Sequence, residues 1–228
     1  MPRVQAVAFD VIETLFPIAP LRPRLVGAGL PEHALETWFA QILRDAFALE
    51  VASSYEPFAT VATSALRVML RQADLPSEDS VIESVLEGFQ SLDPHDDVTA
   101  GFDRVKQARL PLVTLTNGSA KVTEALLDRA GLRDRVDQVI VIDDVKHWKP
   151  SAAVYTHCAA QLDIAPARLA LVAAHGWDIH GAARAGLATG FVRRDGQPMT
   201  GAMHSPDVQA DDLPTVIDGL VALPDAAD

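Results

Sequence analysis

The sequence predicts an α/β protein, in which a parallel sheet carries helices on both faces and a helical cap is inserted after the first strand. Three observations predict this class: short apolar runs recur along the chain, helix-like stretches lie between them, and residues 18–91 show helical periodicity without a strand pattern. Strands that alternate with helices favour parallel pairing. We therefore expect a core domain formed by residues 1–17 and 92–228 and a cap domain formed by residues 18–91.

The expected strands are apolar along their length, which is typical of strands buried on both faces of a parallel sheet. The first runs from Val4 to Phe9, and the others cover residues 110–115, 136–142, 169–174 and 189–192. Helices are expected between these strands, at residues 120–130, 151–162 and 179–185.

Three closely spaced prolines, Pro17, Pro20 and Pro23, mark the entry to the expected cap, and the turn at residues 92–97 marks its exit. Between these points, residues 35–51, 59–73 and 80–89 carry apolar side chains at intervals of three and four, as amphipathic helices do. The first of these helices is expected to supply a core face rather than a subunit interface, through an apolar group made of Trp38, Phe39, Ile42 and Leu43.

Composition limits the partners. The 228 residues carry a formal charge of −12, with 49% hydrophobic and 22% charged residues. Nucleic acids and anionic membranes are held by clustered Lys and Arg, so neither is expected as a partner, whereas a small anionic substrate needs only a few local donors. No apolar run approaches the roughly 20 residues of a membrane span. The first strand begins at once after residues 1–3, and Cys158 is the single cysteine, so we expect a cytoplasmic protein in a reducing compartment.

Candidate catalytic side chains follow the expected strands. They are Asp10, the Thr116–Ser119 turn, Lys149 and Asp178. The carboxyl ends of parallel strands meet at one edge of the sheet, so these residues are expected to share a pocket. A carboxylate such as Asp10 is a candidate nucleophile that can form a covalent ester. Taken singly, each residue also fits a structural role as a cap, a turn or a solvated charge.

Two histidines and several aromatic residues are further candidates. His175 fits a base, a hydrogen-bond donor to a leaving anion, or a structural residue, and His147 fits a loop or the rim of a site. Four large aromatic side chains are candidate walls of a small dry pocket, namely Phe16, Trp38, Trp148 and Trp177.

Four segments in order, residues 9–16, 115–118, 149–150 and 177–178, resemble the motifs of the haloacid dehalogenase superfamily, and most closely the type II 2-haloacid dehalogenases. The resemblance implies a Rossmann-like core with an inserted cap, and it is consistent with a homodimer. It implies that Asp10 is the nucleophile, oriented by Thr14 and paired with Lys149. It further implies contacts to the substrate, to the departing halide or to the hydrolytic water for Arg44, Thr116, Asn117, Tyr155 and Asp178. His175, which stands where the family has an asparagine, and Trp177 are two further candidate substrate-binding residues.

Most members of that superfamily are phosphatases, which use a second aspartate two positions after the nucleophile and further acids to bind magnesium. Ile12 and Ala174 stand at two of those positions here. An alkoxide leaves poorly without a general acid, and a hard cation needs oxygen ligands, whereas halide leaves without a proton. We therefore expect no metal and no cofactor, and a hydrolase that removes halide from short 2-haloalkanoic acids, haloacetate or fluoroacetate among them, through an aspartyl ester.

Two alternatives stay open from the sequence. Glu13 displaced into the role of the missing acid would give a magnesium-dependent phosphatase that acts on a small phosphate ester, and loss of turnover would give a non-catalytic binding protein. Glu13 also places a like charge near Asp10, which disfavours two ionised carboxylates unless Glu13 points away or pairs with Lys149 or Arg44. A His175 donor near the halide would help even fluoride to leave.

Overall fold

The computed structural model describes residues 4–225. Residues 1–3, from which the sequence analysis drew part of its expectation of a cytoplasmic protein, lie outside the described residues. Its sheet has six strands in the order β3-β2-β1-β4-β5-β6, and each neighbouring pair is parallel. The strands are β1 (Ala6–Phe9), β2 (Leu112–Thr116), β3 (Gln138–Val141), β4 (Leu169–Ala173), β5 (Ala188–Val192) and β6 (Val208–Ala210).

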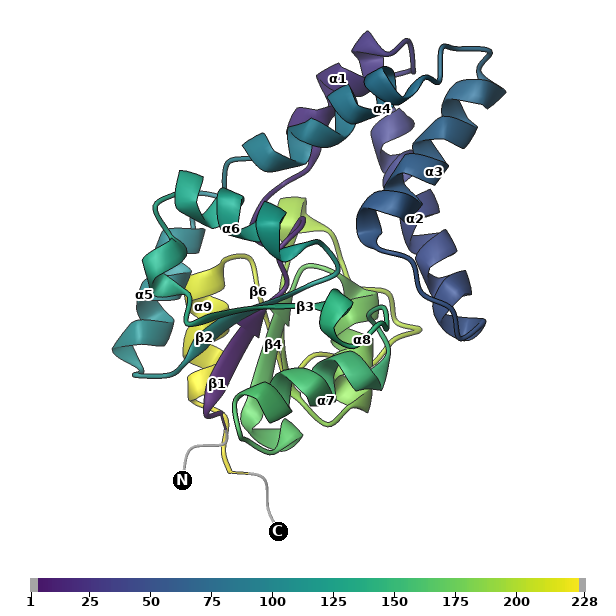
Figure 1. Ribbon diagram of the computed structural model, residues 1–228. Coiled ribbons are helices and arrows are strands. Elements are labelled where there is room, and N and C mark those ends of the chain that lie inside the picture. The colour runs from purple at the N-terminus through teal and green to yellow at the C-terminus, as the bar shows by residue number, and fades with distance from the viewer. Residues whose placement is uncertain (1–3, 226–228) are drawn as a thin grey trace.

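Helices cover both faces of this sheet (Figure 1). One face carries α5 (Val98–Gln107), α6 (Ala120–Arg129) and α9 (Leu213–Val221), and α5 packs directly against α9. The opposite face carries α7 (Ala152–Gln161) and α8 (Gly176–Arg184). The predicted α/β class is confirmed. The sequence expectation omitted β6, α5 and α9, which extend the sheet and complete one of its covering layers.

The inserted segment is helical, as its periodicity predicts. It contains α1 (Arg22–Gly27), α2 (Ala34–Val51), α3 (Phe58–Gln72) and α4 (Asp79–Leu86), and within residues 18–91 no strand interrupts them. These helices lie together beyond the edge at which the strands end (Figure 1). The helical cap therefore stands directly over the strand ends that carry the candidate catalytic residues.

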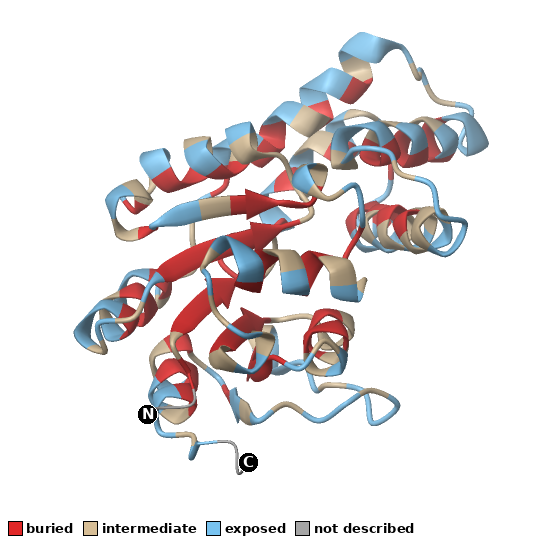
Figure 2. Ribbon diagram, turned by 60° about the horizontal axis from the view of Figure 1, so that its bottom comes forward, coloured by how far each residue is buried: buried red, intermediate tan, exposed pale blue. Residues whose placement is uncertain are grey.

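The buried core continues from the sheet into the cap (Figure 2). Strands β1, β2, β4 and β5 are buried at every position, because both of their faces are covered. In α2, Trp38 and Ile42 are fully buried against α3, so this helix supplies a core face as predicted. Across residues 4–225, the structure shows no helix with the length and apolarity needed to span a membrane.

Candidate active site

A tight loop after β1 positions the candidate nucleophile. The backbone N–H groups of Leu15 and Phe16 both donate to the carbonyl of Val11, which folds residues 11–16 back on themselves. This fold brings the Thr14 hydroxyl to Asp10, where Oγ1 donates to Oδ2 at 2.6 Å. The same Oγ1 accepts the N–H of Ala174, just beyond β4, at 2.9 Å. Thr14 therefore fixes the Asp10 carboxylate and connects two neighbouring strand ends.

Lys149 lies between two carboxylates with no exposed surface of its own. Its Nζ is 3.1 Å from Asp10 Oδ1 and 2.8 Å from Asp178 Oδ2. Burial lowers the pKa of Lys149, but the two nearby carboxylates raise it further than burial lowers it, so the net pKa lies above its usual value. The ammonium group of Lys149 therefore stays charged between the two carboxyl groups.

Asp178 lies behind Lys149 and does not face the open space over Asp10. Its side chain is fully buried, Oδ2 accepts from Lys149, and Oδ1 accepts from the Tyr155 hydroxyl at 2.6 Å. Burial raises the pKa of the Asp178 carboxyl and also that of the Tyr155 phenol, which therefore remains a donor. Both residues therefore support Lys149. The water-activating role of Asp178 and the pocket contact of Tyr155, which the resemblance implies, stay predictions.

The close approach of α7 to α8 depends on Gly181. A Cβ built at Gly181 would lie 2.7 Å from the Tyr155 hydroxyl and 2.5 Å from Cβ of Pro150. Contacts this short have no room for a side chain, so glycine allows the Tyr155 hydroxyl to reach Asp178 from the neighbouring helix.

The space directly over Asp10 is small and mostly apolar. It has a volume of about 20 Å³, and Asp10 itself is only 5% exposed. The cap closes it from above with Phe39 and Leu43 of α2 and Phe58 at the start of α3. The core contributes the remaining walls, which are Asp10, Ile12, Thr116, Asn117, Gly118, His175 and Trp177.

The turn after β2 lies beside this space, as the sequence predicts. Thr116 Oγ1 accepts the Gly118 N–H at 2.9 Å, and Asn117 Oδ1 accepts the Lys149 N–H at 3.2 Å. Ser119 caps α6 by accepting the N–H of Val122 at 3.3 Å. The polar groups of this turn and the start of α6 offer donors suited to a small anion.

His175 lies beside Asp10, the candidate nucleophile. Its Nε2 lies 3.9 Å from Asp10 Oδ2 and 3.3 Å from the Ile12 carbonyl, and its ring stacks on Trp177 at 5.1 Å between centroids. The ring of Phe39 packs nearby at 5.9 Å. The histidine therefore presents a polar nitrogen to an otherwise apolar part of the space. His147, in contrast, is half-exposed and contacts Glu50 of the cap at 2.9 Å, which fits the predicted loop position.

Arg44 does not reach this space. Its guanidinium pairs with Asp45 at 2.8 Å, and its side chain is 68% exposed. Three of the four aromatic residues expected to wall a pocket, Phe16, Trp38 and Trp148, are fully buried in the core. Among the four, Trp177 lines the space over Asp10.

Glu13 is directed away from Asp10. Its Oε1 accepts the Ile18 N–H at 2.6 Å, and it forms neither of the ion pairs considered from the sequence. Its backbone has a φ of 67°, a conformation that is uncommon for a residue with a side chain. The Glu13 carboxylate therefore stabilises the loop after β1 and does not line the space over Asp10.

The sequence analysis did not identify two residues that help to form the site. Arg194, after β5, donates from Nε and Nη2 to the Thr14 carbonyl at 3.1 and 2.7 Å and pairs with Asp97 at 2.8 Å, so it holds the loop that carries Thr14. Phe58 reaches the site from the cap, far from any motif. Neither position carries a local pattern, because both depend on the packing of distant segments. Among residues 4–225, no group of three or more His, Cys, Asp or Glu side chains is arranged to hold a metal ion.

Comparisons with known proteins find relatives along the whole chain. A family model described as haloacid dehalogenase-like hydrolase matches residues 4–186. The chain is 26% identical over 222 residues to an (S)-2-haloacid dehalogenase of Pseudomonas sp. strain YL, covering 96% of this chain and 95% of the relative. It is 25% identical to (S)-2-haloacid dehalogenase H-109 of Pseudomonas putida, covering 97% and 100%. The solved structure of L-2-haloacid dehalogenase from Xanthobacter autotrophicus superposes with a TM-score of 0.88 at 23% identity, covering 97% and 100%.

Proposed function

The chain belongs to the haloacid dehalogenase-like hydrolases, and from that premise we propose that it removes halide from 2-haloalkanoic acids through an ester on Asp10, without a metal ion. The observation that carries the proposal is the buried Asp10–Lys149–Asp178 arrangement, with Thr14 on the second oxygen of Asp10. It holds the Asp10 carboxylate in one orientation, beside a buried ammonium group and under a small apolar space. The names of the curated relatives support a 2-haloacid as the substrate.

In the first step, an oxygen of Asp10 attacks C2 of the substrate, and the electron pair of the carbon–halogen bond leaves with the halide. Lys149 and Thr14 hold the carboxylate in one orientation, which raises the fraction of encounters that can react. Thr116 and Asn117, with the N–H groups at the start of α6, bind the substrate carboxylate. His175 donates a hydrogen bond to the departing halide.

In the second step, water attacks the ester carbonyl carbon of Asp10. The bond between that carbon and the ester oxygen bonded to C2 breaks, and this oxygen, which came from Asp10, leaves with the product as the hydroxyl of a 2-hydroxy acid. One proton is released to solvent for each ester cleaved, and the Asp10 carboxylate is restored. The buried apolar walls strengthen the interaction between Lys149 and the charge that develops on Asp10.

The donor set fits a magnesium-dependent phosphatase poorly. Lys149 and Tyr155 occupy both oxygens of Asp178, and Ile12 and Ala174 provide no side-chain oxygen. A hard cation prefers several oxygen ligands, which these positions do not supply. The carboxylate of Glu13, which could have served as the missing acid, accepts a backbone N–H instead.

Halide release tests the proposal. Chloroacetate, fluoroacetate and each enantiomer of 2-chloropropionate are incubated with the enzyme in the presence of EDTA, and Asp10→Asn serves as the control. We expect halide release that EDTA does not affect and that the variant loses. Release that stops with EDTA would contradict the metal-independent mechanism. No release from any substrate would favour a non-catalytic binding protein, or a phosphatase if phosphate esters are cleaved with magnesium.

A further inference from the structure

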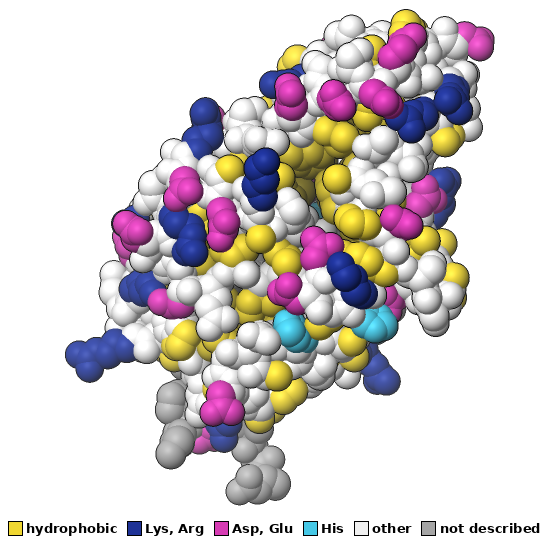
Figure 3. Space-filling view, viewed as in Figure 1, with side chains coloured by type: hydrophobic (Ala, Val, Ile, Leu, Met, Phe, Trp, Pro, Cys, Tyr) yellow, Lys and Arg dark blue, Asp and Glu magenta, His cyan; other side chains and the backbone are white. Residues whose placement is uncertain are grey.

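A second, larger cavity adjoins the space over Asp10. Its volume is about 300 Å³, at the lower end of the range for small-molecule sites. Figure 3 shows hydrophobic side chains gathered around the hollow between the cap and the core. Ile12, Phe58, Thr116 and Gly118 line both spaces, so the two spaces meet beside the candidate nucleophile. We call the larger one the side cavity.

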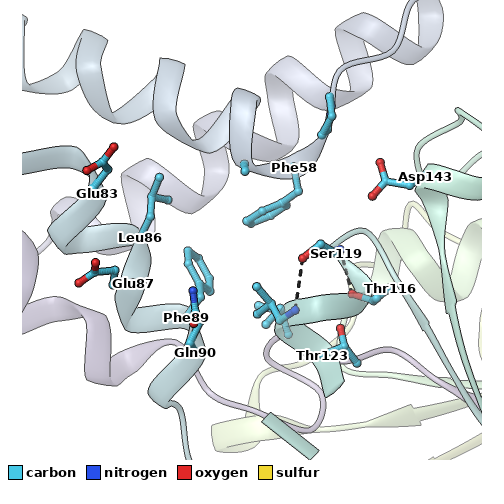
Figure 4. A pocket seen from close by; sticks show the side chains of 15 residues that line it. Phe58, Glu83, Leu86, Glu87, Phe89, Gln90, Thr116, Ser119, Thr123 and Asp143 are labelled. Atoms are coloured by element: carbon cyan, nitrogen blue, oxygen red, sulfur yellow. Dashed lines mark hydrogen bonds between the residues drawn. The ribbon is translucent and has the colours of Figure 1, made fainter. Parts of the chain in front are cut away.

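Figure 4 shows the apolar side chains of Phe58, Leu86 and Phe89 on the cap side of the side cavity, and Thr116, Ser119, Thr123 and Asp143 on its core side. From the cap come Phe58, Leu86 at the end of α4 and Phe89, whose ring packs edge-on against Phe58 at 5.5 Å. From the core comes Val122 in the first turn of α6. Such walls favour a hydrocarbon group over water, because burial removes apolar surface from solvent on both partners.

The charged residues of the side cavity are all acidic. Glu83 and Glu87 are exposed residues of the cap, and Asp143 after β3 accepts the Tyr55 hydroxyl. No Lys or Arg stands among the described residues that line it. A second carboxylate at the far end of a bound chain would therefore meet like charge, whereas an uncharged chain would not.

Geometry limits what can occupy the side cavity during the reaction. The carbon under attack must lie against Asp10, and the accessible space there, about 20 Å³, is little more than the roughly 10 to 15 Å³ that a cavity needs to hold one water. On another side, Phe39, Leu43 and His175 also line a third space of about 380 Å³, which carries several charged side chains, among them Arg22 and Arg194. An uncharged apolar group attached to C2 therefore fits better past Ile12 and Phe58, in the side cavity, than in that charged space.

We propose that the side cavity binds the C2 substituent of the substrate, and that the enzyme prefers 2-haloacids with an uncharged apolar chain of several carbons over haloacetate and 2-halopropionate. This inference rests on the proposed function and extends it to the substrate class. One methylene in a hydrophobic pocket changes kcat/KM by about 10-fold or more, so a butyl group should exceed a methyl group by at least about tenfold.

Three substrates and steady-state bromide release test the proposal. They are racemic 2-bromopropanoate, 2-bromohexanoate and 2-bromohexanedioate, which differ in chain length and in a terminal carboxylate. We expect 2-bromohexanoate to have the highest kcat/KM, and 2-bromohexanedioate to fall below it by about tenfold. Equal or lower kcat/KM for 2-bromohexanoate than for 2-bromopropanoate would overturn the inference while leaving the dehalogenase function in place. No bromide from any of the three would overturn both.

Variants test whether the side cavity causes the preference for a longer C2 substituent. Leu86→Trp fills it from the cap and Val122→Phe fills it from the core, so each should lower the butyl-to-methyl ratio of kcat/KM by about tenfold. Ser84→Trp, on an exposed position of the same helix α4, is the matched control and should keep the ratio. If both filling variants keep the wild-type ratio, or if the control lowers it equally, the side cavity does not select the substituent.

Discussion

Replacing Lys149 by methionine removes the only positive charge that the structure places between Asp10 and Asp178 in its described residues. The ammonium group is fully buried and lies 3.1 and 2.8 Å from the two carboxylates. Removing one partner of a buried ion pair typically costs about 3 to 5 kcal/mol, because the remaining charge stays buried without compensation. We expect Lys149→Met to lower the free energy of unfolding by about that amount near neutral pH, and to abolish halide release.

The destabilisation caused by Lys149→Met should change with pH in a definite direction. Burial raises the pKa of Asp178 above that of the unfolded chain, and loss of Lys149 removes an interaction that opposes this rise. A carboxyl whose pKa is raised on folding contributes stability below its unfolded pKa of about 4 and loses it as pH rises through the folded value. The destabilisation of the variant should therefore be larger at about pH 8 than at about pH 5.

Urea denaturation followed by circular dichroism measures both quantities. Lys121→Met is the matched control, because Lys121 is an exposed residue of α6, and it should stay within about 0.5 kcal/mol of the wild type at both pH values. A Lys149→Met protein destabilised by less than about 1 kcal/mol would refute the assignment of Lys149 as the buried counter-ion. A destabilisation that grows toward acidic pH would refute the sign assigned to Asp178.

Three other substitutions test the surroundings of Asp10. Thr14→Val removes the donor to Asp10 Oδ2 and leaves the Ala174 N–H without its acceptor. Halide-release assays should show kcat at least about tenfold lower, and urea denaturation should show the free energy of unfolding lowered by about 1 to 3 kcal/mol. His175→Ala should slow fluoride release more than chloride release, because a hydrogen bond stabilises the smaller anion more strongly, and an unchanged chloride-to-fluoride rate ratio would argue against this donor. Glu13→Gln keeps an oxygen for the loop and should leave kcat/KM within about threefold of the wild type, whereas a large loss would restore Glu13 as a catalytic acid.

The sequence predicted the parts of the fold that follow from local pattern. Apolar runs located five of the strands, and the meeting of parallel strand ends explains why Asp10, Thr116 and Lys149 lie together. Strand β6 has three residues, and its half-exposed pattern is too short to be distinguished from a loop.

The features of the site that the sequence did not reveal concern the cap and the buried partners of Lys149. Phe39 and Leu43 are four residues apart and share a face of α2, whereas Arg44 lies about 100° around the helix from Leu43 and points to solvent. The sequence shows that α2 carries both apolar residues and Arg44, but it does not show which face of this helix is turned to Asp10. The supporting role of Asp178 depends on a contact with Tyr155 across two helices, which no spacing in the chain reveals.

The most direct test of the account is a single turnover in water labelled with heavy oxygen, with enzyme in excess over 2-chloropropionate, followed by mass spectrometry of the product and of the proteolytic peptide that contains Asp10. Because the attacking oxygen comes from Asp10, we predict that the first product carries unlabelled oxygen and that the Asp10 peptide gains the label. Label in the first product and none in the peptide would show that water attacks the substrate directly, and it would contradict the aspartyl ester on which the account depends.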